Sequence, residues 1–550
     1  MNILNYSGVI YGETEVIKLF RTEFGKTVFF NKYRNKAGGC DTWEDLCDTL
    51  VKRVCTGLMH PGDMTQLAAY MREMKFIPAG RYLYYAGREA AFFNNCFSFT
   101  AEDSREGWAD LGYKHFMALM VGGGCGTYYG EVRPRGELIS RTGGVASGPI
   151  PLMHAMNEIG RNVQQGGSRR SALYGSLPAL HENTDEFLVA KDWSEEVKAL
   201  KAVDFNFPAP LDMTNISVQY DDITQIGTKV FNDNVYQACK TGEPGMQFDF
   251  YAPNEVGRNA CAEFITDQDS DLCNLGSINL SRIGSIEELR DVTYLASQFL
   301  ACGSIRAELP YQRCYEVRES SRKIGLGLMG VHEWCIRRGY KYGASLELKK
   351  WLFEYQAYSE VGANEITRRN SVTDCIRFRS VAPAGTISIL AGTTSGIEPL
   401  FATGIKRRFL EGSTWKYQYI AEPFVKYLVT EGIDPAAIET SSDLAKDIER
   451  RLAFQADVQK FVDMGISSTI NLPEWGSEYN NEDTVDNCIQ SVKKYATELR
   501  GLTFYPDGSR GGQPLTPVSF KEAIDNEGTT FTEGLDFLET VSCPSGACGI

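Results

Sequence analysis

From about residue 94 onward, short apolar segments alternate with amphipathic segments and glycine-containing turns. The segments with strand character are residues 96–100, 127–132, 172–177, 247–250 and 378–382. Strands that alternate with helices are typical of a largely parallel sheet, because a parallel crossover needs a connection about as long as a helix. The sequence therefore predicts an α/β sheet or barrel, with charged helical stretches such as 443–460 and 483–499 on its outside.

Composition excludes some classes of function. The 550 residues carry 56 Lys and Arg against 71 Asp and Glu, a formal net charge of −15. A general nucleic-acid-binding surface is basic, so no nucleic-acid partner is expected, although a nucleotide needs only a few local donors. No uninterrupted apolar run reaches the roughly 18 residues of a spanning helix, and the first residues lack a signal segment. We therefore expect no membrane partner.

The 15 cysteines are an odd number spread through a long chain. That pattern is typical of a reducing compartment, where cysteines serve as core residues or redox groups. We expect a cytoplasmic protein, and its compact length suits a viral or streamlined genome.

Asn259, Cys261 and Glu263 occupy alternate positions. In an extended segment, alternate side chains leave the backbone on one side, so all three would face a single substrate. A thiol that can become a radical, a carboxylate that accepts a proton and an amide that orients a hydroxyl suit chemistry on a vicinal diol. Alone the pattern is weak, since it more often marks a loop beside a buried cysteine.

Seven motifs occur in the order found in the catalytic subunit of ribonucleotide reductase, which the chain resembles over roughly residues 75–550. They are Asn95-Cys96, the glycine-rich run 122–126, Gly166-Gly167-Ser168-Arg169-Arg170, Asn259-x-Cys261-x-Glu263, residues 273–280, residues 382–388, and the pair Cys543 and Cys548. The resemblance implies a ten-stranded α/β barrel of two antiparallel five-stranded halves, with the radical cysteine on a central finger loop. Apolar residues at helical spacing predict a mainly helical region over residues 1–90. The barrel is expected over 91–530 and a flexible redox-active tail over 531–550.

The resemblance assigns the central chemistry to the alternating triplet. Cys261 would become a thiyl radical and take the 3′ hydrogen of the ribose. Glu263 would accept the proton of the 3′-hydroxyl, and Asn259 would hold the ribose hydroxyls.

Four further cysteines would supply the reducing equivalents. Cys96 would donate the proton with which the 2′-hydroxyl leaves as water, and would end in a disulfide with Cys273. The tail pair Cys543 and Cys548 would regenerate this dithiol by exchange, with a thioredoxin- or glutaredoxin-type protein as external reductant. Most other cysteines are expected to be small buried hydrophobes, for example Cys239, Cys335 and Cys488.

Small and hydroxyl-bearing residues precede a predicted helix at Pro383-Ala384-Gly385-Thr386-Ile387-Ser388. Backbone amides at such a turn favour an anion, so we interpret the segment as a phosphate cradle; the alternative is an ordinary strand-to-helix turn. By resemblance, Asn95 belongs to the substrate site, and Gly124 lets the chain pass close to the ribose.

The resemblance also implies regulation by a deoxynucleoside triphosphate. Asp103, Arg133, Ile139 and Arg141 fall where the family binds this effector, and the arginine fork suits a triphosphate. Surface arginines in solvated ion pairs are the alternative. Residues Gly166 to Arg170 would be the loop that reports the effector to the active site. Helices predicted at about 104–121 and 149–163 would pack against their copies in a homodimer.

Three radical generators distinguish the classes of this family. The oxygen-dependent class relays the radical through two adjacent tyrosines, but here Phe504, which has no hydroxyl, precedes Tyr505. A glycyl-radical motif near the C-terminus is not apparent. The short gap from Cys261 to Cys273 and the stretch 393–399 resemble the adenosylcobalamin-dependent class, which binds its cofactor without a histidine ligand. The alternative is an oxygen-dependent large subunit that needs a separate radical-generating subunit.

Two other classes of protein remain as alternatives: a thiol protein without catalysis, and a nucleotide-binding regulator that has lost it. A metal site is not expected, because Cys543 and Cys548 lack the spacing and neighbouring histidines of a zinc site. The segment 325–330 matches G-x-G-x-x-G. Its flanks look helical, so we interpret it as close helix packing and not as a dinucleotide fingerprint, which should follow a strand.

Overall fold

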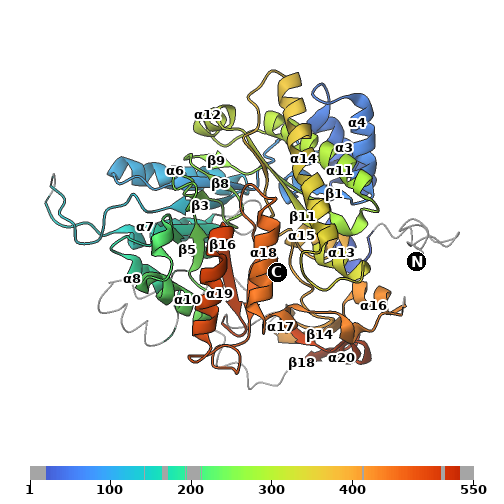
Figure 1. Ribbon diagram of the computed structural model, residues 1–550. Coiled ribbons are helices and arrows are strands. Elements are labelled where there is room, and N and C mark those ends of the chain that lie inside the picture. The colour runs from blue at the N-terminus through green and yellow to red at the C-terminus, as the bar shows by residue number, and fades with distance from the viewer. Residues whose placement is uncertain are drawn as a thin grey trace.

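The computed structural model describes residues 20–140, 143–163, 171–192, 194, 211, 213–411, 414–430, 432–509 and 515–532 (Figure 1). The chain begins with helices: α2 (Glu23–Val28), the π-helical turn η1 (Phe29–Tyr33), η2 (Lys36–Gly38), α3 (Trp43–Cys55), α4 (Pro61–Arg72) and α5 (Gly80–Tyr85). Helix α3 starts with a reciprocal cap, because Thr42 accepts from the Asp45 amide while Asp45 accepts from the Thr42 amide. Leu46 and Leu50, one turn apart, are fully buried.

Five parallel strands follow in chain order and lie side by side. They are β2 (Cys96–Thr100), β3 (Gly124–Tyr128), β4 (Leu173–Pro178), β5 (Asn215–Tyr220) and β6 (Gly245–Phe248). Their connections contain α6 (Arg105–Met120), α7 (Pro149–Asn162), α8 (Thr184–Leu188), η4 (Ile223–Gln225) and α10 (Lys229–Thr241). The expected strand at 127–132 thus begins earlier, because Gly124 and Gly126 lie inside it and not in a turn.

Three more strands extend this sheet. Strand β9 (Asp271–Leu272) pairs with β2, and β16 (Gly501–Pro506) pairs with β6, both antiparallel. Strand β15 (Thr469–Leu472) runs parallel to β16. The sheet order is β15-β16-β6-β5-β4-β3-β2-β9.

A second sheet has the order β1-β10-β11-β12. Its strands are β1 (Phe76–Pro78), β10 (Leu275–Asn279), β11 (Lys323–Met329) and β12 (Arg377–Arg379), and all but β1 run parallel. Helices α11 (Ile286–Arg306) and α14 (Leu346–Arg369) pack on one another and on this sheet. Just beyond β12, Val381 forms a parallel bridge to Ile466, ahead of β15.

The fold is therefore mixed α/β, as predicted. Among the described residues, no ladder between named strands closes the two large sheets into a ring, so the ten-stranded barrel stays a prediction. The short strands β7 (Gly257–Arg258) and β8 (Ile265–Thr266) pair with each other, and β7 packs against β2 and β3. They hold the segment 259–264 next to the parallel strands.

A smaller antiparallel sheet has the order β17-β13-β14-β18. It contains β13 (Gly404–Glu411), β14 (Thr414–Ala421), β17 (Leu515–Val518) and β18 (Thr530–Thr532).

The remaining helices are α12 (Gln312–Ser320), α13 (Val331–Arg337), α15 (Gly385–Ala391), α16 (Pro423–Thr430), η5 (Leu280–Arg282), η6 (Pro435–Ala437), α17 (Ser441–Leu444), α18 (Ile448–Gln459), α19 (Val485–Tyr495), η7 (Ala496–Glu498) and α20 (Phe520–Asp525). In Figure 1, α6 and α7 lie together on one side of the molecule, opposite α3 and α4.

The interpretation of segment 325–330 as helix packing is wrong, because Gly325 and Gly327 lie inside β11. A Cβ at Gly325 would lie 2.4 Å from the Leu275 side chain, and one at Gly327 would lie 2.6 Å from the Ser380 carbonyl oxygen. The glycines therefore allow neighbouring strands to approach closely. The repeated glycines concealed the strand, since glycine is depleted from strands in general.

Cys239, Cys335 and Cys488 are buried, which confirms their prediction as core residues. None of the helices in the described part of the chain combines the length and apolarity needed to cross a membrane.

Candidate active site

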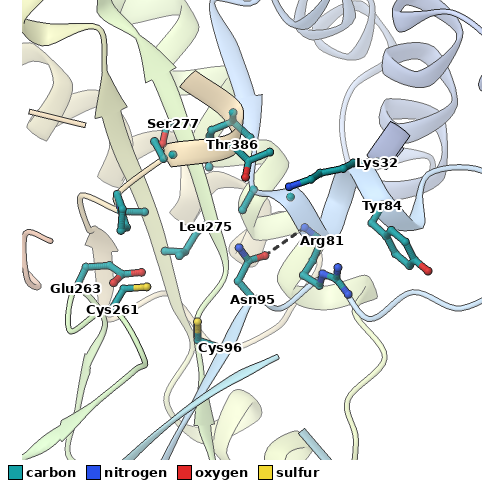
Figure 2. Close-up of a pocket in the computed structure, with 18 of the residues that line it drawn as sticks. Lys32, Arg81, Tyr84, Asn95, Cys96, Cys261, Glu263, Leu275, Ser277 and Thr386 are labelled. Atoms are coloured by element: carbon teal, nitrogen blue, oxygen red, sulfur yellow. Dashed lines mark hydrogen bonds between the residues drawn. The ribbon is translucent and has the colours of Figure 1, made fainter. Parts of the chain in front are cut away.

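A cavity of about 250 Å³ lies where the N-terminal helices meet the two large sheets. It is lined from η1, α5, the start of β2, the segment after β7, the start of β10 and the start of α15. Figure 2 shows Cys261 and Glu263 together at one end, with Cys96 facing them and Lys32 on the far side of Asn95. Most of the residues that the sequence assigns to catalysis or substrate binding thus meet in one cavity, although they come from distant parts of the chain.

The segment that carries Cys261 is a turn, and not the extended segment in which alternate side chains would leave the backbone on one side. The Ala262 amide donates to the Asn259 carbonyl at 3.0 Å, and Ala262 has a φ of +63°. Cys261 is half-buried and Glu263 is buried, and both line the cavity. Asn259 is fully buried and does not line it.

Asn259 fixes Glu263. Its Nδ2 donates to Oε1 of Glu263 at 2.8 Å, and its Oδ1 accepts from the Phe264 amide at 3.0 Å. The Glu263 carbonyl oxygen accepts from the Gly465 amide at 2.8 Å and from the Ser380 hydroxyl at 3.0 Å. Both ends of the turn are therefore held by hydrogen bonds to buried neighbours.

Strand β3 packs directly against the same turn. A Cβ on Gly124 would lie 2.9 Å from the Cβ of Ala260, and one on Gly126 would lie 1.9 Å from the Arg258 carbonyl oxygen. Gly124 is not among the residues that line the cavity, and the close approach that it permits here is to the cysteine turn; its predicted closeness to the ribose stays a prediction. The guanidinium of Arg258 is buried in an ion pair with Asp249, which anchors the chain just before the turn.

Cys96 and Cys273 are adjacent. The Cys96 amide donates to Sγ of Cys273 at 3.0 Å, and the Cys273 amide donates to the Cys96 carbonyl at 3.0 Å. Antiparallel pairing of β2 with β9 produces this register. Burial and the hydrogen bond to Cys96 raise the pKa of the Cys273 thiol well above its usual range. Cys96 lines the cavity, whereas Cys273 is fully buried next to Cys96 and does not line it.

The predicted phosphate cradle opens α15. Pro383, Ala384, Gly385, Thr386 and Ile387 line the cavity. The first amides of a helix have no intrahelical acceptor, so this end can donate to an anion. Ser388 does not line the cavity; it is buried, and its hydroxyl lies 3.1 Å from the Gly385 carbonyl oxygen and 2.7 Å from Oγ of Ser395.

Sequence reasoning missed several lining residues, among them Lys32, Tyr33, Arg81, Tyr84 and Ser277. Ser277 lies inside the motif of residues 273–280, but no local pattern marks Lys32 as a site residue. Arg81 contributes its backbone amide, which donates to Oδ1 of Asn95 at 3.3 Å (Figure 2). Its guanidinium stacks over Tyr84 at 4.7 Å.

The structure brings two of the predicted effector residues together. Nε of Arg133 donates to Oδ2 of Asp103 at 2.6 Å, and both side chains remain partly exposed. The Ile139 amide donates to the Gly144 carbonyl in the neighbouring turn. The other predicted residues of regulation and reduction lie outside the described residues: Arg141, Gly166, Gly167, Ser168, Arg169, Arg170, Cys543 and Cys548.

A second, smaller cavity of about 50 Å³ reaches Cys261 from the side of β15 and β16. Its lining includes Ser217, Ser468, Thr469 and Thr503, so it is rich in hydroxyl groups. Phe504 on β16 is fully buried. In the described part of the chain, no three His, Cys, Asp or Glu side chains are grouped as metal ligands would be.

Comparison with known proteins identifies the family of the chain. A sequence profile of the family described as "Ribonucleotide reductase, barrel domain" matches residues 94–254, 224–369 and 369–504. A vitamin B12-dependent ribonucleoside-diphosphate reductase of Mycobacterium tuberculosis (strain CDC 1551 / Oshkosh) is 27% identical over 551 residues, covering 85% of this chain and 75% of that protein. A protein of the same name from Thermoplasma acidophilum is 26% identical, covering 87% of this chain and 71% of its own length.

The solved class Id ribonucleotide reductase alpha subunit of Actinobacillus ureae is similar in fold. It superposes with a TM-score of 0.70, covering 89% of this chain and 98% of that one, at 15% sequence identity.

Proposed function

The chain belongs to the ribonucleotide reductase barrel-domain family, and on that premise we propose that it reduces ribonucleotides to 2′-deoxyribonucleotides by thiyl-radical chemistry. The observation that carries the proposal is the shared cavity of Cys261, Glu263 and Cys96, with Cys273 directly behind Cys96. A protein that only binds nucleotides has no need of this grouping. We further propose that β2 to β6 form one half of a ten-stranded barrel and that β10, β11, β12, β15 and β16 form the other, with the turn at 259–263 as its finger loop.

In the proposed reaction the Cys261 thiyl radical takes the 3′ hydrogen atom, and Glu263 accepts the 3′-hydroxyl proton. Because the amide of Asn259 is engaged by Glu263 and Phe264, we assign it the task of orienting this carboxylate, in addition to the predicted contact with the ribose. The 2′-hydroxyl leaves as water with a proton from Cys96. Cys96 and Cys273 then supply two electrons and form a disulfide, and Cys261 returns its hydrogen atom to C3′.

The radical on Cys261 needs a generator, and the relatives named above are vitamin B12-dependent. We propose adenosylcobalamin for this chain too; when bound, it supplies the oxidising equivalent that converts a thiol to a thiyl radical by cleavage of its cobalt–carbon bond. The names of these relatives carry this proposal. The second cavity gives another access to Cys261 and is lined by the hydroxyl groups of Ser217, Ser468, Thr469 and Thr503, but at about 50 Å³ it is too small to hold the nucleoside part of the cofactor.

The alternative generator is a separate subunit that passes the radical through adjacent tyrosines. Phe504 argues against it, because a buried phenyl ring has no hydroxyl proton to exchange along such a relay. This second candidate is retained because the chain also shares its fold with the class Id alpha subunit.

We also propose the predicted partners. A deoxynucleoside triphosphate would bind near Asp103 and Arg133, and Arg141 and the loop 166–170 would complete that site. Cys543 and Cys548 would reduce the Cys96–Cys273 disulfide and would themselves be reduced by a thioredoxin- or glutaredoxin-type protein.

The test is turnover by the purified full chain, assayed without oxygen with dithiothreitol, an effector deoxynucleotide and ribonucleoside di- or triphosphates, with and without adenosylcobalamin. We expect deoxynucleotide formation only with the cofactor, and its loss by at least about 1000-fold in Cys261→Ser, with nucleotide binding unchanged. Substantial turnover by Cys261→Ser would refute the radical assignment. Nucleotide binding without product in the wild type would favour the missing-subunit alternative.

A further inference from the structure

The side chain of Lys32, which carries a positive charge, lines the cavity although it lies outside the matched barrel region. Lys32 lies in η1, whereas the family match begins at residue 94. Figure 2 shows its ammonium group directed into the cavity that Thr386 also lines. Turns of π-helix, in which backbone hydrogen bonds span five residues, are rare and occur frequently at functional sites.

Lys32 has no structural task in the described part of the chain. Its Nζ makes no hydrogen bond or ion pair with any described residue, and the side chain is exposed. Asp41, an acid of the same segment, is paired with Arg34 through an Nε–Oδ1 distance of 2.6 Å. An ammonium group directed into a cavity without a counter-ion is available to an anionic ligand.

The backbone on either side of Lys32 packs against α15 and α5, two elements that line the cavity. Helix α2 packs on α15, where a Cβ at Gly25 would lie 2.7 Å from the Ile389 carbonyl oxygen. Turn η1 packs on α5, where a Cβ at Gly80 would lie 3.1 Å from the Tyr33 hydroxyl oxygen. Tyr33, the neighbour of Lys32, is buried. The backbone at Lys32 is therefore packed against both neighbouring elements.

Charge along the cavity is polarised. The Glu263 carboxylate and the Cys261 thiol are at one end, while Lys32 is on the far side of Asn95, near the start of α15 (Figure 2). A nucleotide placed with its ribose at Glu263 would direct its phosphates toward the helix start and Lys32. The reverse orientation would bring phosphate against the carboxylate.

We infer that Lys32 binds the phosphate groups of the ribonucleotide substrate, so that the N-terminal helical region supplies a specificity determinant for the barrel's active site. The inference rests on the proposed function and deepens it. A charge-assisted contact of this kind strengthens binding of a phosphorylated ligand without affecting the nucleoside part.

The experiment measures equilibrium binding of a ribonucleoside diphosphate and of the matching unphosphorylated nucleoside to the full chain, with no cobalamin present and a saturating deoxynucleoside triphosphate added. Lys32→Met should weaken diphosphate binding about tenfold at low salt, leave nucleoside binding unchanged and flatten the salt dependence, because the removed attraction is screened by salt. Lys32→Arg, which keeps the charge, should retain most of the affinity. Lys36→Met is the matched control, since Lys36 lies four residues on and does not line the cavity.

Diphosphate affinity within twofold of wild type in Lys32→Met would overturn the role of Lys32 alone. An equal loss of nucleoside binding would overturn it too, because it would indicate a structural effect. A wild-type chain that binds no ribonucleotide would refute the proposed function itself, and this inference with it.

Discussion

Two histidines are buried in a neutral state, which makes stability dependent on pH. Burial lowers the pKa of His115 to about 4 and that of His332 to about 3. The geometry agrees for His332, because its Nδ1 accepts the Leu400 amide at 2.7 Å and so carries no proton. The unfolded pKa is about 6.5, so the unfolded chain binds more protons as pH falls below it. Between pH 7 and pH 5 we expect each histidine to reduce the free energy of unfolding by about 2 kcal/mol, measured by denaturant titration.

His332→Asn keeps an acceptor where Nδ1 lies and removes the titrating ring. Its stability should fall less between pH 7 and pH 5 than that of the wild type, by about 2 kcal/mol. An identical pH dependence in His332→Asn and wild type would contradict the prediction.

Strand β3 acts as the platform for the cysteine turn. Gly126 approaches the carbonyl of Arg258 so closely that a methyl group would lie 1.9 Å from that oxygen. Gly126→Ala should therefore displace the turn that carries Cys261 relative to Cys96. A displacement of about 1 Å in a reacting group can cost about 100-fold in rate, so we expect turnover to fall at least that far while far-ultraviolet circular dichroism still indicates a folded protein.

Gly343→Ala is the control, because a Cβ there meets no atom within 4 Å. It should keep wild-type turnover. Wild-type activity in Gly126→Ala would contradict the prediction that β3 positions the turn that carries Cys261.

The whole molecule presents an apolar stripe on α6. Tyr113, Phe116 and Met120 are 49%, 41% and 56% exposed and recur at helical spacing on the side of the molecule where α6 packs with α7. Clustered exposed apolar side chains indicate an interaction surface, and a twofold-symmetric one would bury them against their copies. We expect light scattering with effector present to give twice the 61.3 kDa of one chain, and Phe116→Arg combined with Met120→Arg to give the single-chain mass.

Phe353→Arg, on an exposed position of α14, should leave the mass doubled. A single-chain mass for the wild type at working concentration would contradict the homodimer.

Local order in the chain was enough to predict an α/β fold, the family resemblance and about half of the residues that line the cavity. These inferences succeed because Cys96, Cys261, Glu263 and the segment 383–387 each lie in a short motif whose residue types are characteristic. The buried state of Cys239 and its like also follows from residue type alone.

Other features depend on contacts between segments far apart in the chain. Lys32 enters the cavity because α2 and η1 pack on α15 and α5, and Gly325 lies in a strand because its neighbours on both sides are strands. Asn259 bonds to Glu263 because the segment between them turns. Local sequence patterns determine backbone preference and burial. The direction of a side chain and the identity of its partner depend on tertiary packing, because a contact between distant segments contributes energy only in the folded chain.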